Sequence, residues 1–321
     1  MLLSFHRERL QSTTDPTPAQ VKEERRKEKP PAKTTARLKD SEFPPCSGLP
    51  RAYLEQMNSH KSFASFSLAC SIRAHQQPIS CIDLHPRKLI LVSASDDSTW
   101  RLWVGEMLLT GEGHSDWLSG CSFHPDGSKL ATTSGDMTVR LWDFSRGCCV
   151  LMLSGHAQPT WACSFHSCGH FLASCSADRT AKLWDLNSQR CRLTLRQHTA
   201  SVNSVCFLPS SNLLLTCSAD KTIALWDARL GVCTTTFLGH YHPCNHAAFS
   251  SATSMVASCD SSGIVNTWDM RKPTSPMAAG DTGPLSANQV AFNHSGKMLS
   301  QTFCNTCMIT PANQLNNSGT Q

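Results

Sequence analysis

The sequence lacks the segments that direct a chain into or across a membrane. None of its apolar runs approaches the roughly 18–20 uncharged residues that a helix needs to cross a bilayer. The first residues, MLLSFHRERLQ, contain an apolar stretch too short for a secretory signal peptide. Membrane partners are therefore not expected.

A strong charge of one sign is also missing from the main part of the chain. Residues 1–45 contain 10 Lys and Arg against 7 Asp and Glu, whereas residues 46–321 contain 19 against 17. Because the larger part is nearly neutral, a broad nucleic-acid surface is not expected either.

Cysteine, in contrast, is abundant. Seventeen cysteines without a secretory signal indicate reduced thiols in a cytosolic or nuclear protein. Several recur at fixed strand positions, which favours small buried side chains over metal ligands: Cys121, Cys163, Cys175, Cys217 and Cys259. Cys304 and Cys307 form a CxxC without a second pair, so a zinc site there is the less favoured alternative. No metal or cofactor is expected.

A unit of about 42 residues occurs five times. The histidines that mark it are 39, 42, 42 and 42 residues apart, as are its tryptophans: His75, His114, His156, His198 and His240, with Trp103, Trp142, Trp184, Trp226 and Trp268. Four units place a Ser eight residues and an Asp six residues before the Trp: Ser95 and Asp97, Ser134 and Asp136, Ser176 and Asp178, Ser218 and Asp220. His, Ser and Asp could form an acyl-transfer triad. An active site occurs once, however, and four copies predict a structural brace.

Each unit predicts four short strands. In residues 118–155 they read LSGCSFHP, KLATTSGD, TVRLWD and CCVLMLSG, and Gly127 can adopt a positive φ in the tight turn between the first two. This period and these signatures resemble the WD-repeat β-propeller family, whose blades are four-stranded sheets around a central channel. The resemblance implies an all-β fold in which the His, Asp, Ser and Trp of each unit form one hydrogen-bonded chain. In the fifth unit Asp260 stands at the Ser position and Ser262 at the Asp position, so its brace is expected to be broken or rearranged.

The repeat pattern also predicts the domain boundaries. Residues 1–62 form a Pro-rich basic tail that cannot bury enough apolar surface to fold, with a possible short helix at 50–60. The propeller covers 63–299, with units at about 63–103, 104–142, 143–184, 185–226, 227–268 and a partial 269–299, and 300–321 is expected to be unstructured. The partial sixth unit never reaches a Trp. We therefore expect an incomplete ring whose open sheet edges favour self-association, although a tightened five-bladed ring is the alternative. Residues 65–75 are the candidate N-terminal strand.

Within the family, segments such as LLLTCSADKTIALWDARLGVC and VASCDSSGIVNTWDMRK resemble WD-repeat scaffolds of the ciliary central apparatus. That resemblance implies a non-enzymatic scaffold in the bridge between the two central microtubules of motile cilia and sperm flagella, or in germ-cell nuclei. Its partners would be axonemal proteins, with no small-molecule substrate. A general signalling scaffold or ubiquitin-ligase substrate receptor is the alternative.

Two surfaces are candidates for partner binding. The first is a rim formed by Trp117, Trp161 and Tyr241, which follow closely after repeat histidines; packing between blades is the alternative. The second is the basic segment KEERRKEKPPAK of the tail, which could tether the protein to an acidic surface such as tubulin tails or serve in nuclear import. A plain solvated tail is the alternative for this segment.

Overall fold

The computed structural model describes residues 71–250, 254–281, 285–293, 295–296, 298–302 and 307–311. The predicted tail at 1–62 and its possible helix at 50–60 lie outside these residues. Within them every regular element is a β-strand, and no helix has the length and apolarity needed to cross a membrane.

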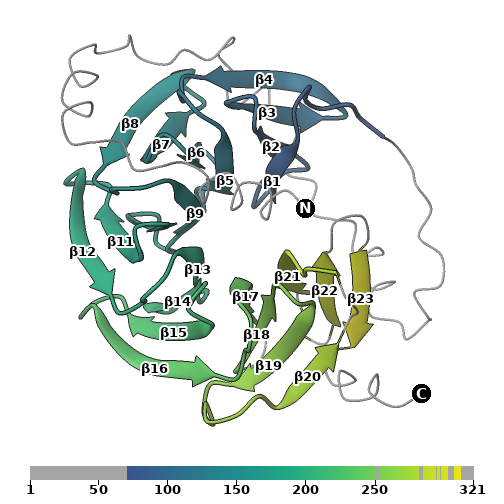
Figure 1. Ribbon diagram of the computed structural model, residues 1–321. Coiled ribbons are helices and arrows are strands. Elements are labelled where there is room, and N and C mark those ends of the chain that lie inside the picture. The colour runs from purple at the N-terminus through teal and green to yellow at the C-terminus, as the bar shows by residue number, and fades with distance from the viewer. Residues whose placement is uncertain are drawn as a thin grey trace, which may run out of the picture.

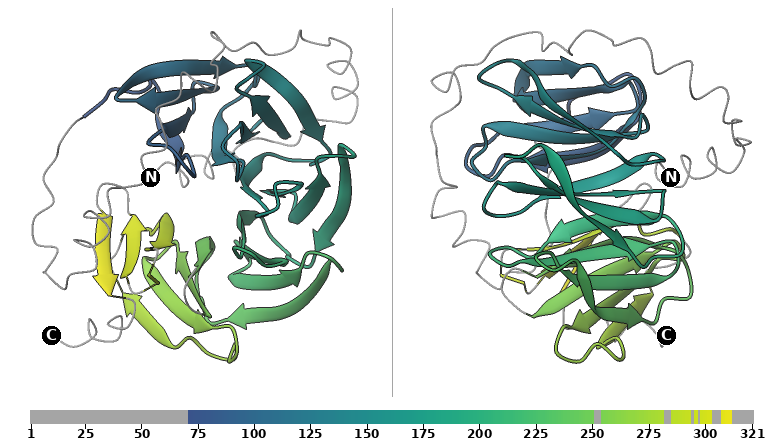
Figure 2. Two further views of the ribbon diagram at one scale, coloured as in Figure 1. Left: turned by 180° about the vertical axis from the view of Figure 1, so that it is seen from behind. Right: turned by 90° about the vertical axis from the view of Figure 1, so that its left-hand side faces the viewer.

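Six antiparallel sheets follow one another in chain order around a common centre, as Figures 1 and 2 show. We call them blades 1 to 6. Blade 1 contains β1 (Ile79–Leu84), β2 (Leu91–Ser95), β3 (Thr99–Val104) and β4 (Glu106–Glu112). Blade 2 contains β5 (Leu118–Phe123), β6 (Lys129–Ser134), β7 (Thr138–Asp143) and β8 (Cys148–Ser154). Blade 3 contains β9 (Thr160–Phe165), β10 (Phe171–Ser176), β11 (Thr180–Asp185) and β12 (Arg190–Arg196).

The remaining blades repeat this meander. Blade 4 contains β13 (Val202–Phe207), β14 (Leu213–Ser218), β15 (Thr222–Asp227) and β16 (Val232–Leu238). Blade 5 contains β17 (Cys244–Phe249), β18 (Met255–Asp260), β19 (Ile264–Asp269) and β20 (Ala278–Asp281). Blade 6 contains β21 (Gln289–Phe292), β22 (Met298–Thr302) and β23 (Cys307–Pro311). The first strand of each blade lies nearest the centre. The all-β propeller predicted from the sequence is confirmed.

Blade 6 corrects the predicted C-terminal boundary. Residues 300–321 were expected to be unstructured, but 300–302 belong to β22, and 307–311 form β23, which pairs with β22 from Thr302–Cys307 to Met298–Pro311. The five-residue strand forms without a Trp-Asp ending, because its backbone ladder with β22 pairs the polar groups on one side of it. The sixth unit therefore contains three strands and extends beyond residue 299. The predicted strand at 65–75 is not seen in its described part, since residues 71–75 have no regular structure.

The hydrophobic core lies between the blades. Five clusters of buried side chains each join two successive blades; the first packs Trp100 and Leu102 of blade 1 against Trp142 and Phe144 of blade 2. The Trp100 and Trp142 rings meet edge to face with centroids 5.4 Å apart, an arrangement that aromatic pairs favour. In the described part of the chain, no such cluster joins blade 1 to blade 6.

The face of blade 1 that would contact a preceding blade is correspondingly exposed. Leu84 is 67% exposed, while Phe123 and Phe207, at the same strand position in blades 2 and 4, are 6% and 7% exposed. Ile82, 60% exposed, corresponds in the same way to the buried Val205. Blades 2 and 4 bury these positions against the preceding blade, and blade 1 has no such neighbour among the described residues.

Candidate functional site

A hydrogen-bonded chain of four side chains crosses each of blades 1 to 5. In blade 3, Nδ1 of His156 lies 2.8 Å from Oδ2 of Asp178, and Nε2 lies 2.8 Å from the Ser174 hydroxyl. The indole N–H of Trp184 donates to the same hydroxyl at 2.8 Å. Because an indole can only donate, the hydroxyl is free to donate to Nε2, and Nδ1–H then donates to the carboxylate. The chain is satisfied with a neutral imidazole.

The same geometry recurs in the other four blades. The histidine is bonded to an Asp carboxylate and to a hydroxyl that also accepts the Trp N–H in each set: His75, Asp97, Ser93 and Trp103; His114, Asp136, Thr132 and Trp142; His198, Asp220, Thr216 and Trp226; His240, Asp260, Ser258 and Trp268.

The serine position predicted for this hydrogen-bonded chain was wrong by two residues. The hydroxyl stands ten residues before the Trp and not eight. Ser176, eight residues before, donates instead to the Gln158 carbonyl at 2.9 Å and accepts the Asp178 backbone N–H at 3.0 Å. Ser95, Ser134 and Ser218 bond to loop carbonyls and Asp N–H groups in the same way. Residues two apart on a strand share a face, so sequence spacing alone did not separate the two candidates.

The aspartate also holds the turn between the second and third strands. In blade 2, Oδ1 of Asp136 accepts the backbone N–H and the hydroxyl of Thr138 at 3.0 and 2.6 Å. The residue between them, Met137, has a φ of +65°, a conformation that costs energy for a residue other than glycine. The two bonds to the carboxylate fix this turn.

Blade 5 rearranges the brace. Oδ2 of Asp260 lies 2.9 Å from Nδ1 of His240, although Asp260 is at the Ser position. Its Oδ1 accepts the N–H and hydroxyl of Ser262 and the N–H of Ile264, and Gly263 takes the positive φ of the turn. One aspartate thus replaces both the Ser and the Asp of the other units.

Burial shapes the electrostatics of the brace. It lowers the pKa of His114, although hydrogen bonding to Asp136 opposes this effect. Burial also raises the pKa of Asp136, but hydrogen bonds from His114 and Thr138 outweigh it and hold the pKa well below its usual range. A buried carboxylate beside a buried imidazole, with the hydroxyl occupied by an indole, leaves no reactive group facing solvent. This arrangement stabilises the blade and offers no nucleophile to a substrate.

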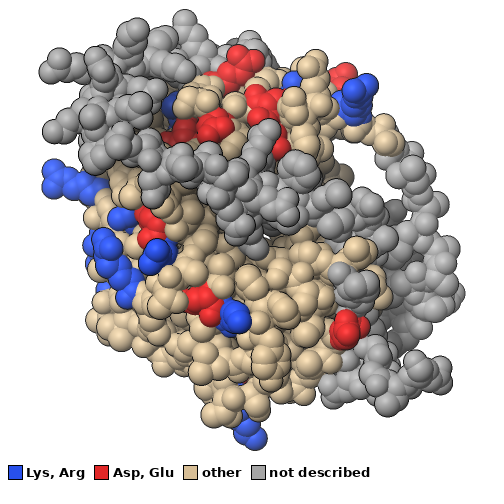
Figure 3. Space-filling model, viewed as in Figure 1, with Lys and Arg blue, Asp and Glu red and all other residues tan. Residues whose placement is uncertain are grey.

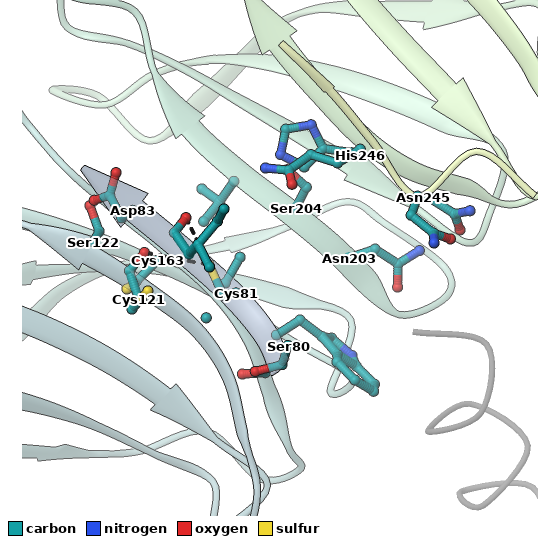
Figure 4. A pocket seen from close by; sticks show the side chains of 18 of the residues that line it. Ser80, Cys81, Asp83, Cys121, Ser122, Cys163, Asn203, Ser204, Asn245 and His246 are labelled. Atoms are coloured by element: carbon teal, nitrogen blue, oxygen red, sulfur yellow. Dashed lines mark hydrogen bonds between the residues drawn. The ribbon is translucent and has the colours of Figure 1, made fainter. Parts of the chain in front are cut away.

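The first strands of the six blades line a central channel of about 400 Å³. Figure 4 shows Cys81, Cys121 and Cys163 gathered on one side of it, with Asn203 and His246 on the other. Burial raises the pKa of Asp83, whose carboxylate accepts the Phe123 backbone N–H from the next blade at 2.8 Å. Within the described residues, no three His, Cys, Asp or Glu side chains are placed to hold a metal ion.

Polar side chains at one channel position connect blades 2, 4 and 5 to the blade that follows each. Ser119 donates to the Thr160 carbonyl at 2.6 Å, Asn203 to the Cys244 carbonyl at 2.6 Å and Asn245 to the Ala287 carbonyl at 2.8 Å. In blade 6 this position is Asn288. Its Oδ1 is buried without a hydrogen-bond partner among the described residues.

The predicted rim is only partly exposed. Trp161 is 4% exposed, and its indole donates to Ser201 of the next blade at 3.0 Å, so its assignment as an exposed rim residue was wrong. Trp117 is half-buried, with its ring 5.3 Å from that of Trp161. Both pack at a blade interface because each stands beside the start of an inner strand. Tyr241 is 79% exposed, the most exposed of the three.

Comparison with known proteins agrees with this architecture. Residues 66–104, 105–143, 147–185, 189–227 and 231–269 match the family model described as WD domain, G-beta repeat. Over 129 residues the chain is 46% identical to Sperm-associated antigen 16 protein of Homo sapiens, which covers 38% of this chain and 20% of that protein. It is 46% identical over 121 residues to the Mus musculus protein of the same name, covering 36% and 19%. Over 71 residues it is 41% identical to Lissencephaly-1 homolog 1 of Paramecium tetraurelia, covering 21% and 16%.

The chain spans about a fifth of the length of these curated relatives. The propeller fold of the family generally serves as a non-enzymatic scaffold for protein–protein interactions. Because the five matched repeats cover more than half of the sequence and contain the first three strands of blades 1 to 5, the chain belongs to the WD40-repeat family.

Proposed function

We propose that this protein is a non-enzymatic scaffold of the axonemal central apparatus in motile cilia and sperm flagella. The observation that carries the scaffold role is the five-fold His–Asp–hydroxyl–Trp brace, whose polar groups are all used inside the blades. Similarity to Sperm-associated antigen 16 protein supports the cellular setting. The partners in this proposal are other central-apparatus proteins, and the location is the ciliary cytoskeleton.

Partner binding falls to the loops and open faces, because rigid blades hold these surfaces at fixed positions. Tyr241 on the rim and the apolar face of blade 1 are the surfaces that we assign to partners. The exposed Ile82 and Leu84 on that face also favour self-association, since the corresponding positions of blades 2 and 4 are buried by a neighbouring blade.

The test is co-purification from ciliated epithelium or testis. An affinity-tagged copy of the chain, expressed at its native level, is isolated from detergent-extracted axonemes and its partners are identified by mass spectrometry. We expect central-apparatus proteins to be enriched over a tagged chain that carries Tyr241→Ala, Ile82→Lys and Leu84→Lys. Recovery of the protein only in the soluble fraction, with no axonemal partner, would contradict the proposal.

A further inference from the structure

The outer strand of blade 3 is unusually basic. β12 carries Arg190, Arg192 and Arg196, all exposed, and no acidic residue. Among the other described outer strands, β4 carries two glutamates, β20 carries one aspartate, and β8 and β16 carry no charge. Figure 3 shows Lys and Arg side chains gathered on the side of the molecule where β12 lies in Figure 1. The propeller as a whole is nearly neutral, but β12 therefore gives it a local positive surface.

A second observation concerns the junction between blades 3 and 4, beside this strand. Blades 1 and 2 each hold the next blade through a histidine at the end of the inner strand. The Nε2 of His124 lies 3.0 Å from the Gly169 carbonyl, and His85 makes the same hydrogen bond to Gly127. Each imidazole also packs edge to face on a phenylalanine of the next blade, His85 on Phe123 and His124 on Phe165.

His166 of blade 3 keeps only half of this contact. Its ring packs on Phe207 of blade 4 with centroids 5.1 Å apart, but its Nε2 is buried and has no hydrogen-bond partner among the described residues. In blade 4 the glycine of the turn is replaced by Ser211, and the positive φ moves to Ser210, which alters the turn that would present the accepting carbonyl. The backbone N–H of Cys168 donates to Nδ1 at 3.1 Å, so the proton of a neutral imidazole lies on Nε2. An unused N–H donor thus points into the junction.

This junction contains a small cavity of about 60 Å³. Its lining combines aromatic rings with donors: Phe171, Phe207, His166, Asn212, Arg192 and Arg229. The Arg192 guanidinium lies 5.4 Å from the centre of the Phe171 ring, and Arg229 is paired with Asp227 at 2.8 Å. Asp185 also interacts electrostatically with Arg192. Arg190 pairs with Asp185 on the same face of the sheet, so three arginines face two carboxylates there, while Arg196 and Lys182 lie on the other face of β12 and β11.

We propose that β12 and this cavity bind an acidic, extended segment of a partner protein. One carboxylate of the segment sits in the cavity, where it accepts the Nε2–H of His166 and pairs with Arg192. Further carboxylates pair with Arg190 and Arg196 along the strand. Guanidinium groups suit this role because they bind carboxylates with two parallel hydrogen bonds. β12 is an edge strand, so an extended segment can lie along it.

The test measures binding of fluorescein-labelled decaglutamate to the full chain by fluorescence anisotropy at 0.1 M salt, with labelled decaglutamine as the uncharged probe. Arg192→Gln should weaken decaglutamate binding roughly tenfold, because a charge-assisted hydrogen bond is lost. Arg190→Gln with Arg196→Gln should weaken it several-fold. His166→Phe removes the N–H donor while keeping a ring on Phe207, and should also weaken binding.

The matched control is Arg271→Gln, an exposed arginine paired with its own aspartate on blade 5. It should bind decaglutamate as the wild type does, and decaglutamine should bind none of the proteins measurably. Thermal melts verify that each variant is folded. If His166→Phe does not fold, Arg192→Gln still tests the proposal. Equal losses for Arg192→Gln and Arg271→Gln, or no binding of decaglutamate by the wild type, would overturn the proposal.

Discussion

His240 and Asp260 form the brace of blade 5 across 2.9 Å, although the aspartate stands two residues earlier than in the other four blades. The carboxylate reaches the imidazole from the end of β18, and it also holds the following turn through Ser262 and Ile264. One side chain at a displaced position therefore does the work that a Ser and an Asp share elsewhere.

Asp260→Ala should destabilise the protein about as much as Asp178→Ala in blade 3, by about 1–3 kcal/mol, because each leaves a buried His unpaired. Ser262→Ala should cost less, since the Asp260 carboxylate keeps His240 and two backbone N–H groups. Chemical denaturation of the three variants measures the free energies of unfolding. A loss for Ser262→Ala as large as that for Asp260→Ala would show that the aspartate is not the centre of this brace.

Thr132 tests the corrected hydroxyl position. Its hydroxyl lies 2.8 Å from Nε2 of His114 and accepts the Trp142 N–H at 2.8 Å. Thr132→Val keeps the shape but leaves both groups unpaired, so we expect a loss of about 1–3 kcal/mol. Thr132→Ser keeps the hydroxyl and should lose much less. Similar unfolding free energies for the Val and Ser variants would contradict the assignment.

His246 makes stability depend on pH. Its Nδ1 is buried without a partner in the described residues, and burial lowers its pKa to about 4. As pH falls below about 6.5, the unfolded chain binds a proton that the folded protein does not bind until pH 4. This group's contribution should therefore be nearly constant well above pH 6.5 and fall by roughly 3 kcal/mol on the way to pH 4. His246→Gln should reduce the difference in melting temperature between pH 7.5 and pH 5.

The exposed His242 supplies the control for this experiment. His242→Gln should leave the pH dependence of melting as it is in the wild type. If both histidine variants change it equally, the buried imidazole is not its source.

The exposed face of blade 1 predicts self-association. We expect the 321-residue chain to form dimers or larger species in light scattering at micromolar concentration, because open edges and apolar faces pair with other chains. Ile82→Lys with Leu84→Lys should shift it toward a monomer. Leu230→Lys, at a similarly exposed position in blade 4, should not. A stable wild-type monomer would mean that this face is covered within the chain itself.

The basic tail gives the last prediction. Binding to microtubules in sedimentation assays should weaken between 0.1 and 1 M salt, as the Debye length falls from about 10 Å to about 3 Å. Deletion of residues 1–45 should reduce binding at low salt. Binding that is insensitive to salt and to the deletion would favour a plain solvated tail.

The repeat made most of the fold predictable. Five regularly spaced Trp residues identified five blades, because one supersecondary unit recurs and each copy supports the others. Blade 6 was underestimated, since β23 is held by backbone pairing with β22 and carries no Trp-Asp ending that a pattern could find.

The site was less predictable for reasons of geometry. His, Asp and Trp of the brace could be named from spacing, but Ser174 and Ser176 share a strand face, and only the inner hydroxyl reaches the imidazole. The recurring pair of small hydroxyl residues, as in SCS or TTS, was the available signal. Trp161 was misplaced because its indole meets Ser201 of the next blade, a contact between units that no single repeat contains.

Because of the hydrophobic clusters between blades, the stability of each blade depends mainly on the blades next to it. Among the described residues each cluster joins only successive blades, so a middle blade is stabilised from two sides and an end blade from one. Damage to blade 1 or blade 6 shortens the arc and leaves the remaining junctions intact. Damage to blade 3 divides it into two pieces that no longer support each other. The position of a substitution along the arc therefore decides how far its effect spreads.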